Sequence, residues 1–281
     1  MRIIGSISDI RAIVRAQKKL GKTIGLVPTM GYLHKGHISL VEASVRENDY
    51  TIISIFVNPT QFGPNEDYVK YPRNMQKDSQ LAEEAGVDVV FAPEAKEIYL
   101  DGFKTYVNVE GITKILCGKT RPGHFKGVAT IVNKLFNIIE PDKAYFGQKD
   151  AQQVAVIKRM AADLNINIEI VACPIVREHD GLAMSSRNTY LSPDERKAAL
   201  VLSRSLFEAG EMIGSGERRK GIILAQILKN LNCEKLANIE YVDILNADTM
   251  GEIKKIEGKV LIALAVKFGT TRLIDNIILE V

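Results

Sequence analysis

The stretch TIGLVPTMGYLHKGHISLVEASV, residues 23–45, decides the fold of this chain. It opens with a β-branched and aliphatic run at 23–27, passes through a Pro-Thr-Met-Gly turn, and continues into an amphipathic segment at 38–45. This succession predicts a strand, a glycine-bearing turn and a helix. His34 and His37 stand at the start of that helix, where free backbone N–H groups and the helix dipole favour anions. The stretch therefore predicts a phosphate site.

Length and composition are those of a soluble globular protein. The chain has 281 residues, and its net charge of +3 is too small to indicate nucleic acid as a partner. Cys117, Cys173 and Cys233 are far apart and form no C-x-x-C pair, which fits a reducing compartment. The N-terminus has charges inside its apolar pattern, unlike a signal peptide, and no apolar run approaches membrane-spanning length. We therefore expect a cytoplasmic protein with no nucleic-acid or membrane partner.

Apolar runs and amphipathic segments alternate through the first part of the chain. Residues 50–57 are nearly all apolar or β-branched, as in a parallel strand covered on both faces. Further strands are expected at 88–91, 143–146 and 168–176, a minor strand at 106–109, and helices near 10–20, 75–85, 128–139 and 151–164. The alternation predicts an α/β fold with a doubly wound, mainly parallel, Rossmann-like sheet. Polar residues follow several strand ends, the edge at which such sheets bind ligands.

The character of the sequence changes after Val176. Ser192-Pro193-Asp194-Glu195 combines an N-cap, a first-turn proline and an acid, and it predicts the start of a long helix. A second helix is expected near 218–231, and strands at 239–245, 260–267 and 272–279 suggest a small antiparallel sheet. We predict two domains: residues 1–176, and a smaller α+β domain at 177–281 that carries the Met184 loop over the site.

The motifs also allow other interpretations. Two histidines three apart share a helical face and suit a metal, but no Glu or Cys lies at ligand spacing nearby. An isolated pair of this kind is most often an ordinary helix start. The Gly-Lys-Thr strings at 21–23 and 118–120 lack the upstream glycine of a P-loop. The phosphate interpretation depends on the motifs found farther along the chain.

Five strings occur in order: PTMGYLHKGH (28–37), FVNPTQFGPNEDYxxYPR (56–73), RPGHFxGV (121–128), YFGQKDAQQ (145–153) and GLAMSSRNxYLS (181–192), where x marks a position that is not part of the match. Together they resemble the pantoate–β-alanine ligase (pantothenate synthetase) family, within the HxGH nucleotidylyltransferase superfamily. The resemblance implies a nucleotidylyltransferase-type fold and ATP-dependent condensation of (R)-pantoate with β-alanine. It also implies pantothenate, AMP and pyrophosphate as products, an enzyme-bound pantoyl adenylate, Mg²⁺ bridging the ATP phosphates, and a homodimer.

The chemistry of the motif residues suits that reaction. Lys149 supplies a mobile charge for a phosphate that moves, and Arg187 can bind phosphate oxygens in bidentate fashion. Gln61 and Gln153 can hydrogen-bond a hydroxyl or a carboxylate without adding charge. Arg121 and His124 have the sign that suits a carboxylate or a triphosphate. Asp150 is interpreted as a ribose or metal–phosphate contact that could also cap a helix.

The resemblance assigns roles to individual residues. The catalytic residues are His34, His37 and Lys149, with His37 as proton donor. The ATP-binding residues are Met30, Gly31, Tyr32, Leu33, His34, Lys35, Gly36, His37, Gly147, Gln148, Lys149, Asp150, Val176, Met184, Ser185, Ser186 and Arg187. Gln61 and Gln153 bind pantoate, Gln61 also binds β-alanine, and Asn58, Arg121 and His124 are additional candidates. No metal is held by protein alone; Asp150 is the candidate that would join the phosphates in holding Mg²⁺.

Two other functions stay open at this point. One is a cytidylyl- or adenylyltransferase that transfers a nucleotide to a phosphate ester and stops there. The two glutamines argue against it, because they suit a neutral hydroxy acid better than a phosphate. The other is an RNA-binding module descended from a synthetase core, which the modest charge and the lack of a basic, aromatic-interleaved stripe disfavour.

Overall fold

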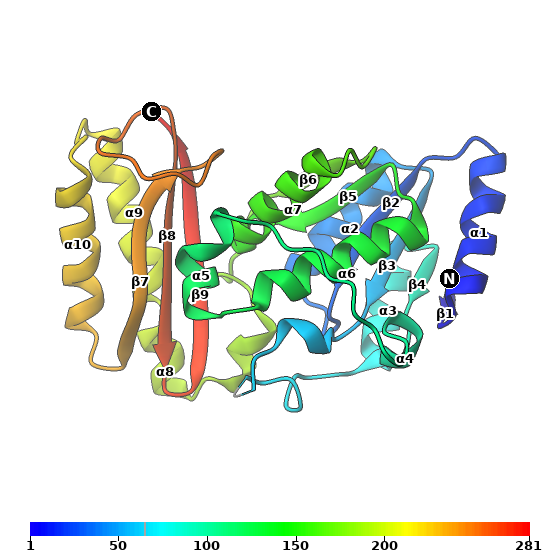
Figure 1. Ribbon diagram of the computed structural model, residues 1–281. Helices are drawn as coiled ribbons and strands as arrows, with labels where there is room; N and C mark the ends of the chain where they lie inside the picture. The colour runs from blue at the N-terminus through cyan, green and yellow to red at the C-terminus, as the bar shows by residue number, and fades with distance from the viewer. Residues whose placement is uncertain (65) are drawn as a thin grey trace.

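The computed structural model describes residues 1–64 and 66–281. A sheet of six parallel strands in the order β1-β4-β3-β2-β5-β6 forms the larger part of the molecule (Figure 1). The strands are β1 (Arg2–Ile4), β2 (Ile24–Thr29), β3 (Tyr50–Ile55), β4 (Val89–Phe91), β5 (Lys143–Gly147) and β6 (Glu169–Cys173). The winding reverses between β2 and β5, so the carboxyl ends of these two strands form the topological switch point. The prediction of a doubly wound parallel sheet is confirmed.

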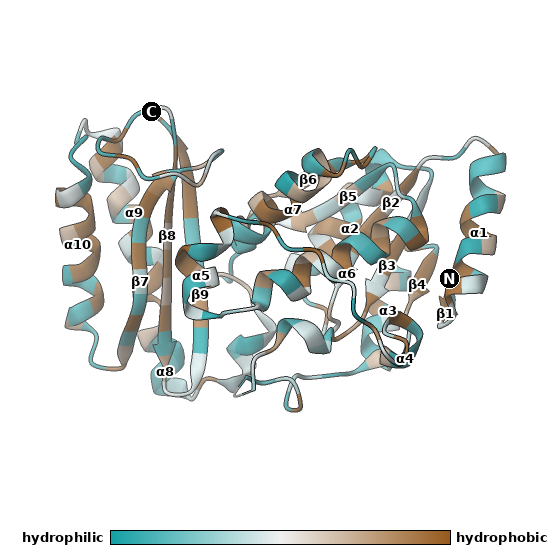
Figure 2. Cartoon of the chain, in the orientation of Figure 1, coloured by the Kyte–Doolittle hydropathy of each residue, from teal (hydrophilic) through white to brown (hydrophobic). Residues whose placement is uncertain are grey.

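Helices cover both faces of this sheet. One face carries α1 (Ile7–Lys19), α6 (His124–Ile139) and α7 (Ala151–Asp163), and the other carries α2 (Lys35–Glu47) and α3 (Met75–Glu84). Leu26 and Ile52 pack toward the first group, whereas Val27 and Ile53 pack toward the second. Because both faces are buried, the strands are nearly continuous apolar runs, visible in brown in Figure 2. None of the helices described has the length and apolar character that crossing a membrane requires.

The C-terminal part is a three-stranded antiparallel sheet of β7 (Ala237–Asn246), β8 (Lys259–Phe268) and β9 (Thr271–Glu280). One face packs on α9 (Val201–Gly214) and α10 (Lys220–Cys233), and the other packs toward the six-stranded part. In Figure 1 this sheet stands between these two helices and the larger sheet. The predicted small antiparallel sheet is therefore present, and both of its faces are covered.

Several expected element boundaries are wrong. Residues 106–109 form no strand, and β1 was missed because only three residues pair. The helix after Ser192 has the predicted capping box but is short: α8 (Pro193–Ala198) ends before α9 begins. α6 begins at His124 rather than Val128, since Gly123 at φ 85° turns the chain into the helix. The basic Gly-Pro segment before it includes a short helix, α5 (Leu116–Thr120), rather than only a turn. The remaining short elements are α4 (Ala95–Ile98), η1 (Pro59–Gln61), η2 (Ile112–Lys114), η3 (Gln148–Asp150) and η4 (Ser186–Tyr190).

The contact between α6 and the η1 turn gives a test of this packing. A Cβ on Gly127 would overlap the backbone of Thr60 and Gln61, so Gly127→Ala should force the turn away from the helix. We expect it to lower the free energy of unfolding by about 1–3 kcal/mol, measured by urea denaturation. Gly221→Ala in α10 is the matched control, because nothing lies near its new Cβ and alanine favours the helix. Equal stability of Gly127→Ala and the parent protein would contradict this packing.

Candidate active site

A cavity of about 220 Å³ opens at the carboxyl ends of the central strands. It gathers most of the residues that the sequence singled out. Those lining it are Met30, His34, Gly36, His37, Asn58, Gln61, Arg121, His124, Gly147, Lys149, Asp150, Gln153, Val176, Met184, Ser185, Ser186 and Arg187. Gly31, Tyr32, Leu33, Lys35 and Gln148 belong to the same segments but lie outside the lining. The cavity is therefore formed by segments that follow β2, β3, β5 and β6.

The turn after β2 is held by a buried carboxylate. Gly31 and Tyr32 both have positive φ, 82° and 52°. Asp78 of α3, only 1% exposed, accepts the N–H groups of Tyr32 at 2.8 Å and Leu33 at 2.7 Å. A Cβ on Gly31 would approach Asp78 Oδ2 to 3.0 Å, so glycine serves both the conformation and the contact. Asp78 was not predicted from the sequence, because an acid in the first turn of a helix is common without any such role.

The two histidines form the N-terminal cap of α2. His34 is the N-cap residue, and its Nδ1 accepts the N–H of Gly36 at 3.1 Å. Nδ1 of His37 accepts the N–H of His34 at 3.3 Å, and the ring centroids are 4.0 Å apart. Since each Nδ1 accepts a hydrogen bond, the proton of each neutral ring is placed on Nε2. Two N–H donors are thus fixed at the end of the helix that attracts anions.

Burial keeps both histidine rings neutral. Desolvation, helped by the charge of Lys149, lowers the pKa of His34 from 6.5 to about 4. Desolvation, followed by the neighbouring His34 and then Lys149, lowers the pKa of His37 well below 6.5. Near neutral pH both rings are therefore hydrogen-bond donors without a net charge. In this structure the neutral His37 ring is suited to donating a hydrogen bond.

The Gly147–Asp150 segment lies at the other strand of the switch point. Lys149 and Asp150 sit in η3, immediately after β5, and both line the cavity. The suggestion that Asp150 caps the following helix is wrong, because its side chain makes no capping hydrogen bond there. From the C-terminal sheet, Asn276 Nδ2 donates to the carbonyls of Gln148 at 3.0 Å and Lys149 at 2.9 Å. The turn is thus supported by a residue to which the sequence analysis gave no role.

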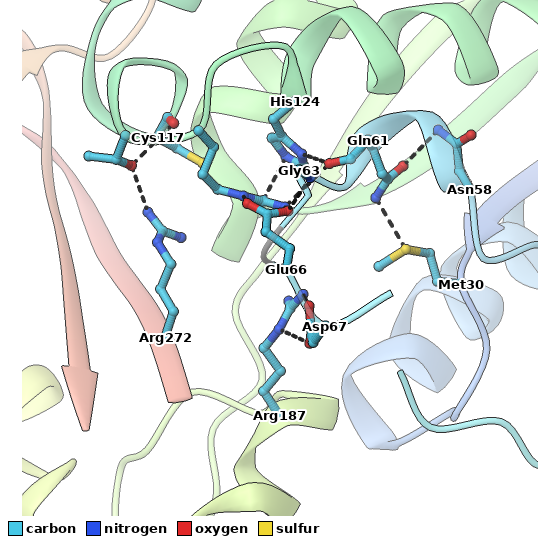
Figure 3. A network of polar contacts seen from close by, with 12 residues as sticks. Met30, Asn58, Gln61, Gly63, Glu66, Asp67, Cys117, His124, Arg187 and Arg272 are labelled. Carbon is cyan, nitrogen blue, oxygen red and sulfur yellow. Dashed lines mark hydrogen bonds and ion pairs between the residues drawn. The ribbon is translucent and has the colours of Figure 1, made fainter. Parts of the chain in front are cut away.

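A chain of amide contacts fixes Gln61 (Figure 3). Asn58, 1% exposed, donates from Nδ2 to Gln61 Oε1 at 3.1 Å, and Gln61 Nε2 contacts Met30 Sδ at 3.1 Å. The ring Nδ1 of His124 lies 2.9 Å from the carbonyl oxygen of Gln61. The side chain and the backbone of Gln61 are therefore both restrained, and the β2 turn and the α6 start converge on it.

Two acids of the loop after β3 pair with the two candidate arginines. Arg121 binds Glu66 through Nε and Nη2, each at 2.6 Å, and Arg187 binds Asp67 at 2.9 and 3.0 Å (Figure 3). Burial alone would raise the pKa of Glu66, but the Arg121 guanidinium overrides it and lowers that pKa to about 2. Neither acid was predicted from the sequence, since acidic residues in a turn-rich loop are usually solvated. A phosphate bound to either arginine must share it with, or take it from, an acid.

An apolar wall faces these polar groups. Val128, Ile131, Val132 and Leu135 of α6 line the cavity together with Phe56, Phe146 and Leu40. The four α6 residues recur at helical spacing, so one stripe of the helix both packs the core and forms the wall. The cavity therefore has a cationic, hydrogen-bonding side and a hydrocarbon side. It suits a ligand with phosphates at one end and a branched aliphatic group at the other.

The pH dependence of folding should report the half-buried, desolvated ring of His34. Its folded pKa of about 4 lies below the ordinary 6.5, so the unfolded chain takes up a proton first as the pH falls. Its contribution is complete above pH 6.5 and is lost progressively toward pH 4. His34→Asn keeps a capping acceptor and removes this titration. Urea unfolding should give a shallower loss of stability for His34→Asn across that range; equal slopes in the two proteins would contradict a desolvated, neutral ring.

Comparison with known proteins gives the family. A family model described as pantoate-beta-alanine ligase matches residues 2–278. A pantothenate synthetase of Acetivibrio thermocellus is 66% identical over 281 residues, the full length of both chains. The crystal structure of the pantothenate synthetase of Thermus thermophilus is 44% identical with a TM-score of 0.94, and the match covers 99% of each chain.

A further solved structure carries ligands. The pantoate-beta-alanine ligase of Francisella tularensis, crystallised with beta-gamma ATP and beta-alanine, is 37% identical with a TM-score of 0.79. The match covers 99% of this chain and 97% of that one. Likeness in sequence and in fold therefore extends over nearly the whole molecule. The chain belongs to the pantoate-beta-alanine ligase family.

Proposed function

We propose that this protein condenses (R)-pantoate with β-alanine at the expense of ATP, giving pantothenate, AMP and pyrophosphate through an enzyme-bound pantoyl adenylate. The observation that carries the proposal is the pairing of the histidine cap with Lys149 at the switch point, beside Gln61 and Gln153. Family membership over the full chain supports the same reaction.

The phosphate contacts follow from the positions of the donors. His34 and His37 would direct their Nε2–H groups at the α-phosphate, where charge builds as the carboxylate attacks. Lys149 would follow the phosphates as they separate. Ser185, Ser186 and Arg187 would hold the leaving pyrophosphate, with Asp67 released from Arg187 or sharing it. Met184 and the backbone of Val176 would border the nucleoside, completing the ATP site along the Met30–His37 and Gly147–Asp150 segments.

Pantoate would occupy the end of the cavity where polar and apolar walls meet. The amides of Gln61 and Gln153 can bind its hydroxyl and carboxylate oxygens, while its dimethyl carbon packs against the Val128–Leu135 stripe. Gln61 would also contact β-alanine, and Asn58, Arg121 and His124 would keep that end in place. The amides add no positive charge, so the carboxylate stays nucleophilic.

Two displacements complete the reaction. A pantoate carboxylate oxygen forms a bond to the α-phosphorus, and the bond from that phosphorus to pyrophosphate breaks. The neutral amine of β-alanine then attacks the acyl carbon; the bond from that carbon to the AMP oxygen breaks, and the amine gives its proton to solvent. Holding the reactants in line supplies most of the acceleration, because the phosphoryl and acyl centres need little covalent help from the protein.

The Mg²⁺ requirement is proposed to be met mainly by ATP. Among residues 1–64 and 66–281, no group of three or more His, Cys, Asp or Glu side chains could hold a metal. Asp150 is a single carboxylate in the cavity, which fits an ion that arrives bound to phosphates and gains one protein contact. Such an ion would neutralise phosphate charge.

The proposal also covers the domain division, the oligomeric state and the cellular compartment. We propose that the chain divides near Val176, with the Met184–Arg187 segment of the second domain covering the site. We propose a homodimer, which sedimentation equilibrium would test. The three cysteines are unpaired, and the reaction uses ATP, so we also propose that the enzyme works in the cytoplasm.

ATP–pyrophosphate exchange with pantoate present and β-alanine left out tests the proposal. We expect exchange that requires pantoate, because the adenylate forms reversibly without the amine. Lys149→Ala should lower its rate by about two to three decades, since one such electrostatic contact is worth roughly 3–4 kcal/mol. Lys158→Ala, an exposed lysine on α7, is the control and should exchange normally. ATP binding without exchange would instead favour nucleotide transfer to a different acceptor.

A further inference from the structure

The last strand of the protein reaches the ATP-binding turn. Asn276 of β9 is 2% exposed, and its Nδ2 donates both of its hydrogens, to the carbonyl oxygens of Gln148 and Lys149. These two consecutive carbonyls belong to the η3 turn, which presents Lys149 and Asp150 to the cavity. An amide that bonds two successive carbonyls fixes the rotation of the turn as well as its position.

The residue beside it supports a second ATP-binding segment. Asp275, also 2% exposed, accepts hydrogen bonds from Arg177 at 2.6 and 2.9 Å. Arg177 begins a short hairpin: it bridges to Ala183, and the N–H of Met184 donates to the carbonyl of Val176 at 3.0 Å. That hairpin leads directly into the Met184–Arg187 segment. Adjacent residues of β9 thus hold the bases of both segments.

The pleat of the sheet explains why the adjacent residues Asp275 and Asn276 can support two different segments. Leu273 and Ile277 pack with the core beneath α9 and α10, whereas Ile278 packs with residues of the six-stranded part. Asp275 therefore lies on the helix side, and Asn276 on the side of the larger sheet. Pairing of Asn276 with Ala263 sets this register, and a slip by one residue would exchange the two sides.

We propose that Asn276 is a positioning residue for adenylation: by holding the carbonyls of Gln148 and Lys149 it fixes the Lys149 side chain against the ATP phosphates. This inference rests on the proposed function and adds a role for the C-terminal sheet. Asn276 is absent from the lining of the main cavity and lines a smaller cavity of about 70 Å³, together with Lys149 and Asp150. Both of its amide hydrogens are donated to the turn, so its effect on the reaction runs through Lys149. The C-terminal sheet would then influence how strongly Lys149 stabilises the transition state of adenylation.

The first test compares Asn276→Ala with a matched asparagine variant. Asn230→Ala removes an amide hydrogen bond to Glu208, 2.6 Å long, which joins α10 to α9 away from the cavity. In pantoate-dependent ATP–pyrophosphate exchange, we expect Asn276→Ala to lower kcat/KM for ATP by about tenfold to a hundredfold, as for a misplacement of about 1 Å. Asn230→Ala should leave it unchanged. Asn276→Ser, which keeps one donor, should fall between Asn276→Ala and the parent.

A double-mutant cycle separates positioning from general support of the fold. If Asn276 acts through Lys149, Asn276→Ala should cost little more in the Lys149→Ala background, so the two effects are strongly non-additive. All rates are measured below the unfolding temperature of each variant, and the parent's own exchange tests the proposed function separately. Full additivity, or an unchanged kcat/KM for ATP in both Asn276 variants while the parent exchanges normally, would overturn the proposal.

Discussion

The site depends on one buried contact, the Asp78 carboxylate on the backbone of the turn after β2. That turn must reverse the chain within a few residues, and it does so with Gly31 and Tyr32 at positive φ. Two short hydrogen bonds to Asp78 hold this uncommon conformation in place. Because the turn is fixed, His34 arrives as the cap of α2 and His37 follows one turn later. The two Nε2–H donors are thus set by backbone geometry before any ligand arrives.

Each histidine ring has a structural role and leaves one N–H group for a ligand. Nδ1 of each ring satisfies a backbone N–H that a helix start would otherwise leave free, and this leaves Nε2–H for a ligand. Burial removes the positive charge from both rings. The fixed cations nearby, Arg121 and Arg187, are paired with Glu66 and Asp67. Much of the positive charge in the cavity is therefore balanced, and under the proposed function Lys149 would bind the phosphates.

Much of this could be predicted from the sequence because local patterns carry it. The apolar runs predicted the parallel strands. The ordered motifs predicted that the histidines, Lys149 and the glutamines follow strand ends, which the sheet brings together. Other features depend on long-range contacts that leave no local pattern. Three acids, Asp78, Glu66 and Asp67, lie in sequence contexts that are typical of the protein surface. Only the fold shows which groups they bind. Asn276 lies more than a hundred residues from the turn that it supports. The start of α6 differs from the predicted one because the left-handed conformation of Gly123 sets it.

The central claim is that the pantoate carboxylate attacks the α-phosphorus held at the switch point. The most direct measurement uses pantoate labelled with ¹⁸O in its carboxylate, incubated with ATP and β-alanine, and follows the label by mass spectrometry. An acyl adenylate transfers one carboxylate oxygen to AMP, so each AMP formed should carry one ¹⁸O. Label found in inorganic phosphate, with ADP as the nucleotide product, would mean attack at the terminal phosphorus and would contradict the account.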